Sequence, residues 1–422
     1  MVTVAFVIFF ISIFIGLPLY TGLILSGLIF IFHFGLSFTI IIQRMFSIAQ
    51  SFPLLAIPFF ILAGELMNTG GVSRRLINFA NSLVGHVWGG LAQVTVLVSM
   101  FFAGMSGSAI ADASGVGVVL IPAMKKKGYS SKFSAAVVAS AGTIGILIPP
   151  SIPMVVYGWM VGESVGKLFL AGAVPGVLVG ISLMLLCMWL SRKYGYAKEK
   201  RASFNEIINY GKKALLALFT PLIVVGGVIF GFVTATECAI VAVVWAFIIS
   251  MFVYKDLKWK MLPEILVRTT VSTAKVMIII AASSTFAWLL TFVNAPQQVS
   301  AFIFSITNNK YLLLLLINIL LLVTGMFMDL TPALLIFTPI LYPVVCKIGV
   351  DPIHFGVIMV VNLAIGLYTP PVGTTLFVAG SLAKSPIEEV AKELIPFYMV
   401  SLIVLLLVTY IPAISLWLPS LF

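Results

Sequence analysis

The sequence predicts an all-α polytopic membrane protein with about 11 transmembrane segments and two re-entrant hairpins, because a spanning helix needs about 20 mostly apolar residues. Three observations support this fold class. Hydrophobic residues make up 61% of the 422 residues, and charged residues only 9%. The charges gather in a few loops, and the two halves of the chain repeat one pattern of acids, glycines and prolines. Such a composition leaves no room for a sizeable soluble domain.

The first expected element is an apolar run over residues 1–16, which lacks the basic start and the cleavage site of a signal peptide. We therefore expect it to remain as the first helix. Lys and Arg number 24 and gather mainly at 192–213 and 255–268. Such clusters mark cytoplasmic loops and not a surface for nucleic acid, so we expect no nucleic-acid partner. The apolar stretches 214–233 and 238–254, which lie between the clusters, return the chain to the same side of the membrane.

Two copies of one residue pattern divide the chain. The matching pairs are Asp112 and Asp329, Pro122 and Pro339, Gly128 and Gly349, Gly145 and Gly366, Pro149-Pro150 and Pro370-Pro371, and Pro175 and Pro396. Internal repeats are typical of secondary transporters. We expect a first half at 1–191, a basic cytoplasmic linker at 192–213 and a second half at 214–422. An inverted repeat is favoured, because it places two equivalent broken helices around one site at the membrane midplane.

Each half contains three interrupted elements of the same kinds. In chain order they are a hairpin near 52–84, a broken helix at 104–122 and a Pro-Pro break at 142–158, then a hairpin near 281–306, a broken helix at 324–341 and a Pro-Pro break at 362–380. Turn residues at 68–71 and 294–296 interrupt the hairpins, which leaves arms that are too short to span.

The broken helices combine small residues, hydroxyl groups and an acid. Gly104, Ser106 and Gly107 precede Asp112 in the first, and Asp329 follows a glycine in the second. Unwound backbone at membrane depth is tolerated only where it is buried in protein or lines a wet cavity, and its free carbonyl groups suit an alkali cation. Close packing of small residues is the alternative for the first segment, and a cap or a surface charge is the alternative for Asp112.

An acid inside an apolar run costs about 2.5 to 3.5 kcal/mol at the middle of a helix and needs a compensating partner. Asp329 is therefore the strongest single candidate for a functional residue. The Pro-Pro steps add a second signal, because each removes two amide donors and disfavours helix at the preceding residue. The carbonyls before the step are free to bind a cation, and the next half-helix offers amides to an anion. A plain proline kink is the alternative.

Three runs of sequence resemble a known family. They are GMSGSAIADASGVGVVLIPAMKKKGYS at 104–130, GTIGILIPPSIPMVVYG at 142–158 and NLAIGLYTPPVGTTLFVAG at 362–380. These runs are similar to the large membrane (M) subunit of tripartite ATP-independent periplasmic (TRAP) transporters, of the DctM-like family, and the similarity covers nearly the whole chain.

The resemblance implies a multi-pass protein of the bacterial inner membrane that imports a carboxylate-bearing solute together with Na+ by an elevator mechanism. The solute would be sialic acid, a C4-dicarboxylate or a related organic acid. The resemblance also implies two protein partners, which are a small four-helix membrane subunit (Q type) and a periplasmic solute-binding protein (P type), with membrane lipids around the chain.

The resemblance also implies two sodium sites and a solute site between them. Sodium would be held by Ser106, Gly107, Ser108 and Gly145 in a first cleft and by Gly325, Gly366, Thr369 and Val372 in a second. The solute would be bound by Ser108, Ser151, Asp329, Pro149, Pro150 and Thr374. Ile148 occupies the position that matches Thr369, so only its carbonyl is available in the first cleft.

Other functions fit the sequence less well. A stand-alone ion-coupled carboxylate carrier or antiporter would use the same repeat, and dependence on a binding protein separates the two. We expect no enzyme activity, because the chain has no HExxH pattern and no His lies near the serines of these motifs. The chain also has no P-loop, so direct use of ATP is not encoded in it. A passive channel fits a duplicated cleft poorly. Moving one charge through 100 mV is worth about 2.3 kcal/mol, so importing a monoanion into a negative interior needs a co-transported cation.

Overall fold

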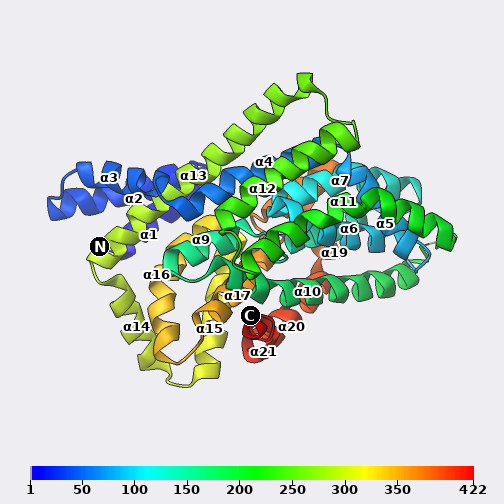
Figure 1. Cartoon of the computed structure of the whole chain (residues 1–422). Helices are drawn as coiled ribbons and strands as arrows, with labels where there is room; N and C mark the ends of the chain where they lie inside the picture. Colours follow the sequence, from blue (N-terminus) through cyan, green and yellow to red (C-terminus); the bar gives the residue numbers. More distant parts are fainter. Residues whose placement is uncertain (1, 197) are drawn as a thin grey trace.

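The computed structural model describes residues 2–196 and 198–422, and in that part of the chain it contains helices and no β-strand (Figure 1). Met1, in the predicted first helix, and Ala197, in the predicted linker, lie outside the described residues. The all-α fold predicted from composition is confirmed.

The helices of the first half are α1 (Val2–Phe14), α2 (Leu19–Phe34), α3 (Thr39–Ala49), α4 (Ala56–Thr69), α5 (Val72–Val84), α6 (Gly90–Ser106), α7 (Ala109–Lys126), α8 (Ser131–Gly142), α9 (Ile152–Val161) and α10 (Val165–Tyr194). Those of the second half are α11 (Phe204–Ile229), α12 (Ala235–Ile248), α13 (Leu262–Phe292), α14 (Ala295–Ile306), α15 (Lys310–Phe327), α16 (Leu330–Lys347), α17 (Pro352–Gly366), α18 (Thr374–Ala383), α19 (Ile387–Glu393), α20 (Ile395–Tyr410) and α21 (Ala413–Leu416).

The protein crosses the membrane several times. Within the described residues, seven helices are long and apolar enough to span it, or eight if the bent pair of α19 and α20 counts as one span. Further apolar helices, among them α6, α9, α17 and α18, have 10 to 17 residues and are too short by this measure. The expected number of about 11 segments, which assumes about 20 residues for each span, therefore stays a prediction.

Polar residues at helix starts explain several boundaries. Ser203 and Thr234 begin α11 and α12, and each accepts from the backbone N–H of a glutamate three residues later. The glutamates Glu206 and Glu237 bond back to the backbone N–H of their caps, which completes a capping box at each helix. Glu237 is thus accounted for as part of a helix start.

The regions predicted as hairpins are each built from two helices. In the first, α4 and the short turn before it form a candidate span over Phe52–Thr69, and Gly71, with φ +75°, begins the amphipathic α5. In the second, α13 runs for 31 residues before Asn294, with φ +56°, starts α14. The arm expected from residue 281 is thus the end of a much longer helix. Polar residues early in α13, such as Glu264 and Arg268, mask its length in the sequence.

The two repeats interlock at the centre of the molecule. The half-helix α9, which follows the first Pro-Pro break, packs against α16 and α17 of the second repeat. The half-helix α18, which follows the second break, packs in turn against α7 and α8 of the first repeat. In Figure 1, α9, α16 and α17 meet in the middle of the view, while α1 to α3 extend to one side. Each repeat therefore completes the packing of the other.

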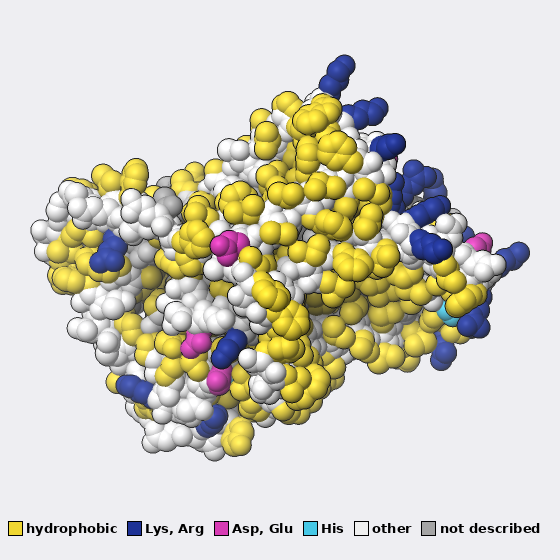
Figure 2. Space-filling view, in the orientation of Figure 1, with side chains coloured by type: hydrophobic (Ala, Val, Ile, Leu, Met, Phe, Trp, Pro, Cys, Tyr) yellow, Lys and Arg dark blue, Asp and Glu magenta, His cyan; other side chains and the backbone are white. Residues whose placement is uncertain are grey.

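Much of the surface is apolar. Figure 2 shows hydrophobic side chains over much of the visible face, with many Lys and Arg side chains along its upper and right margins and a few at its left and lower left. Large apolar residues such as Phe14, Phe46 and Phe232 are more than two-thirds exposed. An apolar surface of this extent is typical of a protein whose solvent is lipid.

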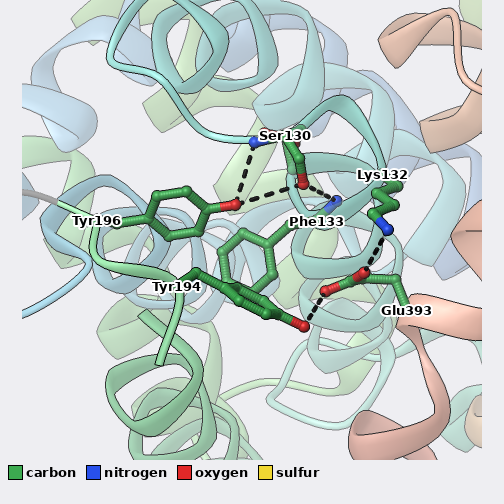
Figure 3. Close-up of polar contacts among 7 residues, drawn as sticks. Ser130, Lys132, Phe133, Tyr194, Tyr196 and Glu393 are labelled. Atoms are coloured by element: carbon green, nitrogen blue, oxygen red, sulfur yellow. Dashed lines mark hydrogen bonds and ion pairs between the residues drawn. The ribbon is translucent and has the colours of Figure 1, made fainter. Parts of the chain in front are cut away.

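The predicted basic linker overlaps the end of α10 and the start of α11, and its first residues are fixed to neighbouring helices (Figure 3). The Tyr194 hydroxyl donates to Glu393 Oε1 at 2.7 Å. The Tyr196 hydroxyl accepts from the Ser130 backbone N–H at 3.2 Å and donates to the Ser130 hydroxyl at 3.4 Å. Lys132 pairs with the other oxygen of Glu393 at 3.6 Å. The exit of α10 is thereby tied to the start of α8 and to α19.

Candidate functional site

The first cleft forms where α6 gives way to α7. The helix ends at Ser106, and Gly107 takes a left-handed conformation with φ +60°. Ser108 is extended, and its hydroxyl accepts from the Ala111 N–H at 3.4 Å, which starts α7. A Cβ on Gly107 would lie 3.0 Å from the Pro150 carbonyl oxygen, so this break packs directly against the first Pro-Pro break.

Asp112 lies at the centre of this cleft. Its side chain is completely buried, and the Ser106 hydroxyl donates to its Oδ1 atom. Its Oδ2 atom has no hydrogen-bond partner among the described residues. Gly145 lies so close that a Cβ there would clash with the carboxylate. Asp112 is therefore part of the cleft, and the alternative of a surface charge is wrong.

The first Pro-Pro break is held by Ser151. After α8 the chain makes one 3₁₀ turn over Thr143–Ile146, and α9 begins at Ile152. The Ser151 hydroxyl donates to the Ile146 carbonyl at 2.6 Å and accepts from the Met154 N–H at 3.4 Å. These bonds satisfy backbone groups that the break frees. The hydroxyl of Ser151 is thus engaged within the turn.

The second cleft forms where α15 and α17 cross. A Cβ on Gly366 would lie 2.5 Å from the Gly325 carbonyl carbon, so the two helices are in backbone contact. The Val372 N–H donates to the Met326 carbonyl at 3.0 Å. The Thr369 hydroxyl donates to its own helix, at the Ile365 carbonyl, over 2.7 Å. The cleft is therefore closed by main-chain contacts between the two broken elements.

The second Pro-Pro break leads into α18. The Thr375 N–H and hydroxyl both donate to the Leu367 carbonyl at 2.9 Å, across the loop that contains the prolines. Gly373 precedes α18 with φ +36°. The buried hydroxyl oxygen of Thr374 accepts or donates no hydrogen bond of standard geometry among the described residues. The same is true of Asp112 Oδ2 at the first cleft. The first cleft therefore holds a buried carboxylate oxygen that no described hydrogen-bond donor satisfies, whereas Thr374 lies near the Asp329 carboxylate.

A cavity of about 130 Å³, which we call the central cavity, lies between the two clefts. Its lining residues are Gly107, Ser108, Ala109, Ile110, Ile146, Ile152, Pro153, Val276, Asp329, Leu330, Thr331 and Leu367. The N-termini of α7, α9 and α16 all meet there, since Ala109, Ile152 and Leu330 are their first residues. The first N–H groups of a helix lack partners within it and carry partial positive charge. The cavity is therefore suited to bind a carboxylate.

The central cavity brings together only some of the predicted solute residues. Ser108 and Asp329 line it from opposite repeats. Pro149, Pro150, Ser151 and Thr374 are not among its lining residues, and their roles stay predictions. Of the predicted sodium residues, Ser106 and Gly145 contact Asp112, and Gly325 and Gly366 contact each other.

The predicted site did not include several residues that the structure places in it, among them Asp112, Ile152 and Val276. Asp112 belongs to the first cleft, and its match with Asp329 in the repeat would have identified it. Ile152 and Val276 line the central cavity. Val276 comes from α13, far away in the sequence, and no motif marks it.

The clefts offer oxygen atoms of carbonyl, hydroxyl and single carboxylate groups. In the described part of the chain, no three residues of His, Cys, Asp or Glu come together as a metal site. Oxygen ligands of this kind suit a hard cation and not a transition metal.

Comparison with known sequences identifies close relatives. The family described as "Tripartite ATP-independent periplasmic transporter, DctM component" matches residues 6–414. The chain is 44% identical over 377 residues to the C4-dicarboxylate TRAP transporter large permease protein DctM of Pseudomonas aeruginosa, covering 89% of this chain and 88% of that one. It is 40% identical over 412 residues to the sialic acid TRAP transporter large permease protein SiaM of Vibrio cholerae, covering 97% and 96%.

A longer relative and two solved structures are also similar. The isethionate TRAP transporter permease protein DctMQ of Oleidesulfovibrio alaskensis is 43% identical over 405 residues, which are 96% of this chain but only 64% of the relative. The YdaH transporter of Alcanivorax borkumensis has a TM-score of 0.60 at 13% identity, covering 88% of this chain and 87% of that one. MtrF of Neisseria gonorrhoeae has a TM-score of 0.60 at 11% identity, covering 93% and 85%. The last two show likeness of fold alone.

Proposed function

The chain belongs to the DctM family of tripartite ATP-independent periplasmic transporter components, and from this premise we propose that it imports a carboxylate-bearing solute with Na+, in dependence on a binding protein. It is a multi-pass permease of the inner membrane and not an enzyme. The proposed solute is sialic acid, a C4-dicarboxylate or a related organic acid. Relatives named for C4-dicarboxylate and sialic acid support this class.

One observation carries the proposal. The N-termini of α7, α9 and α16 meet at one cavity between two clefts, with Ser108 on one side and Asp329 on the other. The helix amides would bind the carboxylate of the solute. Asp329 would accept a hydrogen bond from a hydroxyl or amide group of the solute, or it would contact a bound cation. In the second case the solute and the ion would lie side by side.

Sodium coupling is supported by the clefts and by the charge balance. Asp112 is buried without a cationic partner in the described part of the chain, and a carboxylate at membrane depth costs about 2.5 to 3.5 kcal/mol. A bound Na+ would offset that cost. The proposed sodium ligands are the oxygens of Ser106, Gly107, Ser108 and Gly145, with Asp112 added, in the first cleft, and of Gly325, Gly366, Thr369 and Val372 in the second.

An elevator mechanism is supported by the way the repeats interlock. Because α9 and α18 each complete the packing of the opposite repeat, the two clefts and the central cavity belong to one packed unit. We propose that this unit moves as a body and carries the solute and Na+ with it.

Two protein partners are proposed. One is a small four-helix membrane subunit of Q type, which the printed name and the greater length of the DctMQ relative support. The other is a periplasmic solute-binding protein of P type, which the tripartite description of the family supports.

The test is uptake into liposomes that contain the chain and its small subunit, with the cognate binding protein outside and an inward Na+ gradient. We expect uptake of labelled solute only when both the binding protein and the gradient are present. Glu388→Gln removes the charge of an exposed acid on α19 and should leave uptake unchanged. Equal uptake without the binding protein would favour a stand-alone ion-coupled carrier instead.

A further inference from the structure

The helices α4, α12 and α13 enclose an apolar groove of about 300 Å³, which shares no lining residue with the central cavity. All of its lining side chains are aliphatic or aromatic, and two of them, Val244 and Leu266, are more than half exposed. One water molecule needs only about 10 to 15 Å³ by the same measure, and apolar cavities stay dry. The apolar groove therefore has room for a hydrocarbon chain of many atoms.

One end of the apolar groove is held in place by hydrogen bonds. Ser250 lies in the wide helical turn Ile249–Val253 that ends α12, and its hydroxyl donates to the Leu66 carbonyl of α4 at 3.3 Å. The Leu257 N–H donates to the Ser250 carbonyl at 3.2 Å, and the Leu257 side chain is buried. The loop between α12 and α13 is therefore folded back onto the helices that form the groove.

This loop carries three exposed lysines, Lys255, Lys258 and Lys260. None of them forms an ion pair with an acid in the described part of the chain. The two acids nearby in the sequence are already paired, Asp256 with Arg75 and Glu264 with Arg268. The loop therefore presents positive charge that no protein group neutralises.

Trp259 connects the lysines to the groove. It lies between Lys258 and Lys260 in the chain, and its exposed ring meets the ring of Phe247 edge-on, with 6.0 Å between the centroids. Phe247 is itself a wall of the groove. Figure 1 shows the start of α13 at the upper edge of the view, and Figure 2 shows Lys and Arg there above apolar side chains. The positive charge and the apolar groove are thus neighbours.

This combination fits one class of ligand. Lys and Arg just cytoplasmic of a spanning helix attract anionic lipid headgroups, and Trp prefers the level of the headgroups. The sequence places this basic loop on the cytoplasmic side. A helix of another subunit could cover the apolar groove, but an apolar helix face would leave the three lysines without counter-charges.

We propose that the groove between α4, α12 and α13 binds an anionic phospholipid of the cytoplasmic leaflet, with an acyl chain in the groove and the phosphate beside Lys258 and Lys260. The bound lipid would join the start of α13 to α4 and α12. This inference goes beyond the proposed function, since it depends on neither the solute nor Na+.

The test measures the thermal unfolding of the purified, delipidated full chain in detergent at constant ionic strength. The additions are dioleoyl phosphatidylglycerol, which is anionic, dioleoyl phosphatidylcholine, which has the same chains and no net charge, and inorganic phosphate, which has no chains. We expect phosphatidylglycerol to raise the unfolding temperature more than phosphatidylcholine does, and phosphate to leave it unchanged.

Variants locate the effect. Joint replacement by Lys258→Gln and Lys260→Gln should raise the phosphatidylglycerol concentration for the half-maximal shift about tenfold or more, because each lysine near a headgroup contributes severalfold. Lys200→Gln with Arg201→Gln removes two exposed charges from the linker and is the matched control, which should not change that concentration.

A second pair of variants tests the groove itself. Leu266→Trp would fill its open side and should weaken the effect of phosphatidylglycerol, whereas Leu215→Trp, on the exposed face of α11, should not. The lysine variants lie on the surface and keep the test decisive if Leu266→Trp does not fold.

Three results would overturn the inference. Equal shifts with the two phospholipids would remove the preference for negative charge. An equal loss of the shift in the Lys200 and Arg201 control would show attraction to any basic surface. If Leu266→Trp abolishes co-purification with the small membrane subunit but keeps the phosphatidylglycerol shift, the groove is a subunit interface and not a lipid site.

Discussion

The oxygen atoms around Asp112 support the proposed cation site. One carboxylate oxygen accepts from Ser106, and the other faces Gly145 without a hydrogen-bond partner among the described residues. A glycine at position 145 is required there, because any side chain would occupy the space beside that free oxygen. The Asp112 carboxylate is thus costly to bury, and one of its oxygens lacks a partner among the described residues. A bound cation would contact that oxygen and offset the cost.

Asp112→Asn should weaken sodium binding. The amide keeps the size of the side chain but removes its charge, and a contact with a charged group is worth about 1.5 to 3 kcal/mol. We expect the Na+ concentration for half-maximal uptake to rise about tenfold or more, measured in liposomes at fixed solute concentration. Glu388→Gln should not change it. An unaltered sodium dependence in Asp112→Asn would remove Asp112 from the sodium site.

Gly366→Ala should separate α15 from α17 and open the second cleft. The added Cβ would lie 2.5 Å from the Gly325 carbonyl carbon, and overpacking of this kind costs about 1 to 3 kcal/mol. We expect a lower unfolding temperature in detergent together with loss of uptake. Gly226→Ala is the control, because a Cβ at that position on α11 meets no atom within 4 Å. Equal behaviour of the two variants would contradict the close backbone contact.

At the scale of elements, the half-helices α9 and α18 depend on the loops that precede them. Ser151 holds the start of α9 through the Ile146 carbonyl and the Met154 N–H, and it is completely buried. Thr375 plays the corresponding part for α18 through the Leu367 carbonyl. Side-chain hydroxyls thus replace backbone hydrogen bonds that prolines cannot make.

Ser151→Ala should destabilise the start of α9. Loss of a helix cap costs about 0.5 to 2 kcal/mol, and the buried Ile146 carbonyl loses its donor as well. We expect a drop in the unfolding temperature of the detergent-solubilised chain. Ser164→Ala, which removes the exposed cap of α10, should cost less because water can satisfy the freed amides. A larger effect at Ser164 than at Ser151 would contradict the role given to Ser151.

Local sequence signals could predict the helix breaks but not the lengths of the flanking helices. Gly107 and the two Pro-Pro pairs are recognisable because glycine and proline act on their own backbone. The 31 residues of α13 were not predicted as one helix, because its first turns carry polar groups and its last turns are apolar. Whether a helix continues depends on which other segments pack against each of its turns, and this packing is set by the tertiary structure.

At the scale of the whole molecule, the repeat predicted which residues correspond but not how the copies fit together. Asp112 and Asp329 could be paired from the sequence alone. The packing of α9 on α16 and of α18 on α7 could not, since no residue pattern indicates which half-helix meets which partner. Val276 likewise reaches the central cavity from a helix outside both predicted clefts. Spatial contact between distant segments is therefore the part of the site that sequence reasoning missed.

The interlocked repeats place the central cavity between the two clefts that we propose as cation sites. If solute and sodium occupy them together, their movements across the membrane are linked. The charge of the cargo then decides the energetics, because each charge moved through 100 mV is worth about 2.3 kcal/mol. A monoanion that enters a negative interior needs at least one Na+ to cancel its charge, and a second one to gain from the potential.

The most direct test of this account is to measure the uptake of labelled Na+ and labelled solute in the same liposomes, in the presence of the binding protein. We predict that Na+ enters with the solute at a ratio of at least one per monoanion, and that Asp329→Asn abolishes both fluxes together. Solute uptake that continues at the same rate when K+ replaces Na+ would contradict the account.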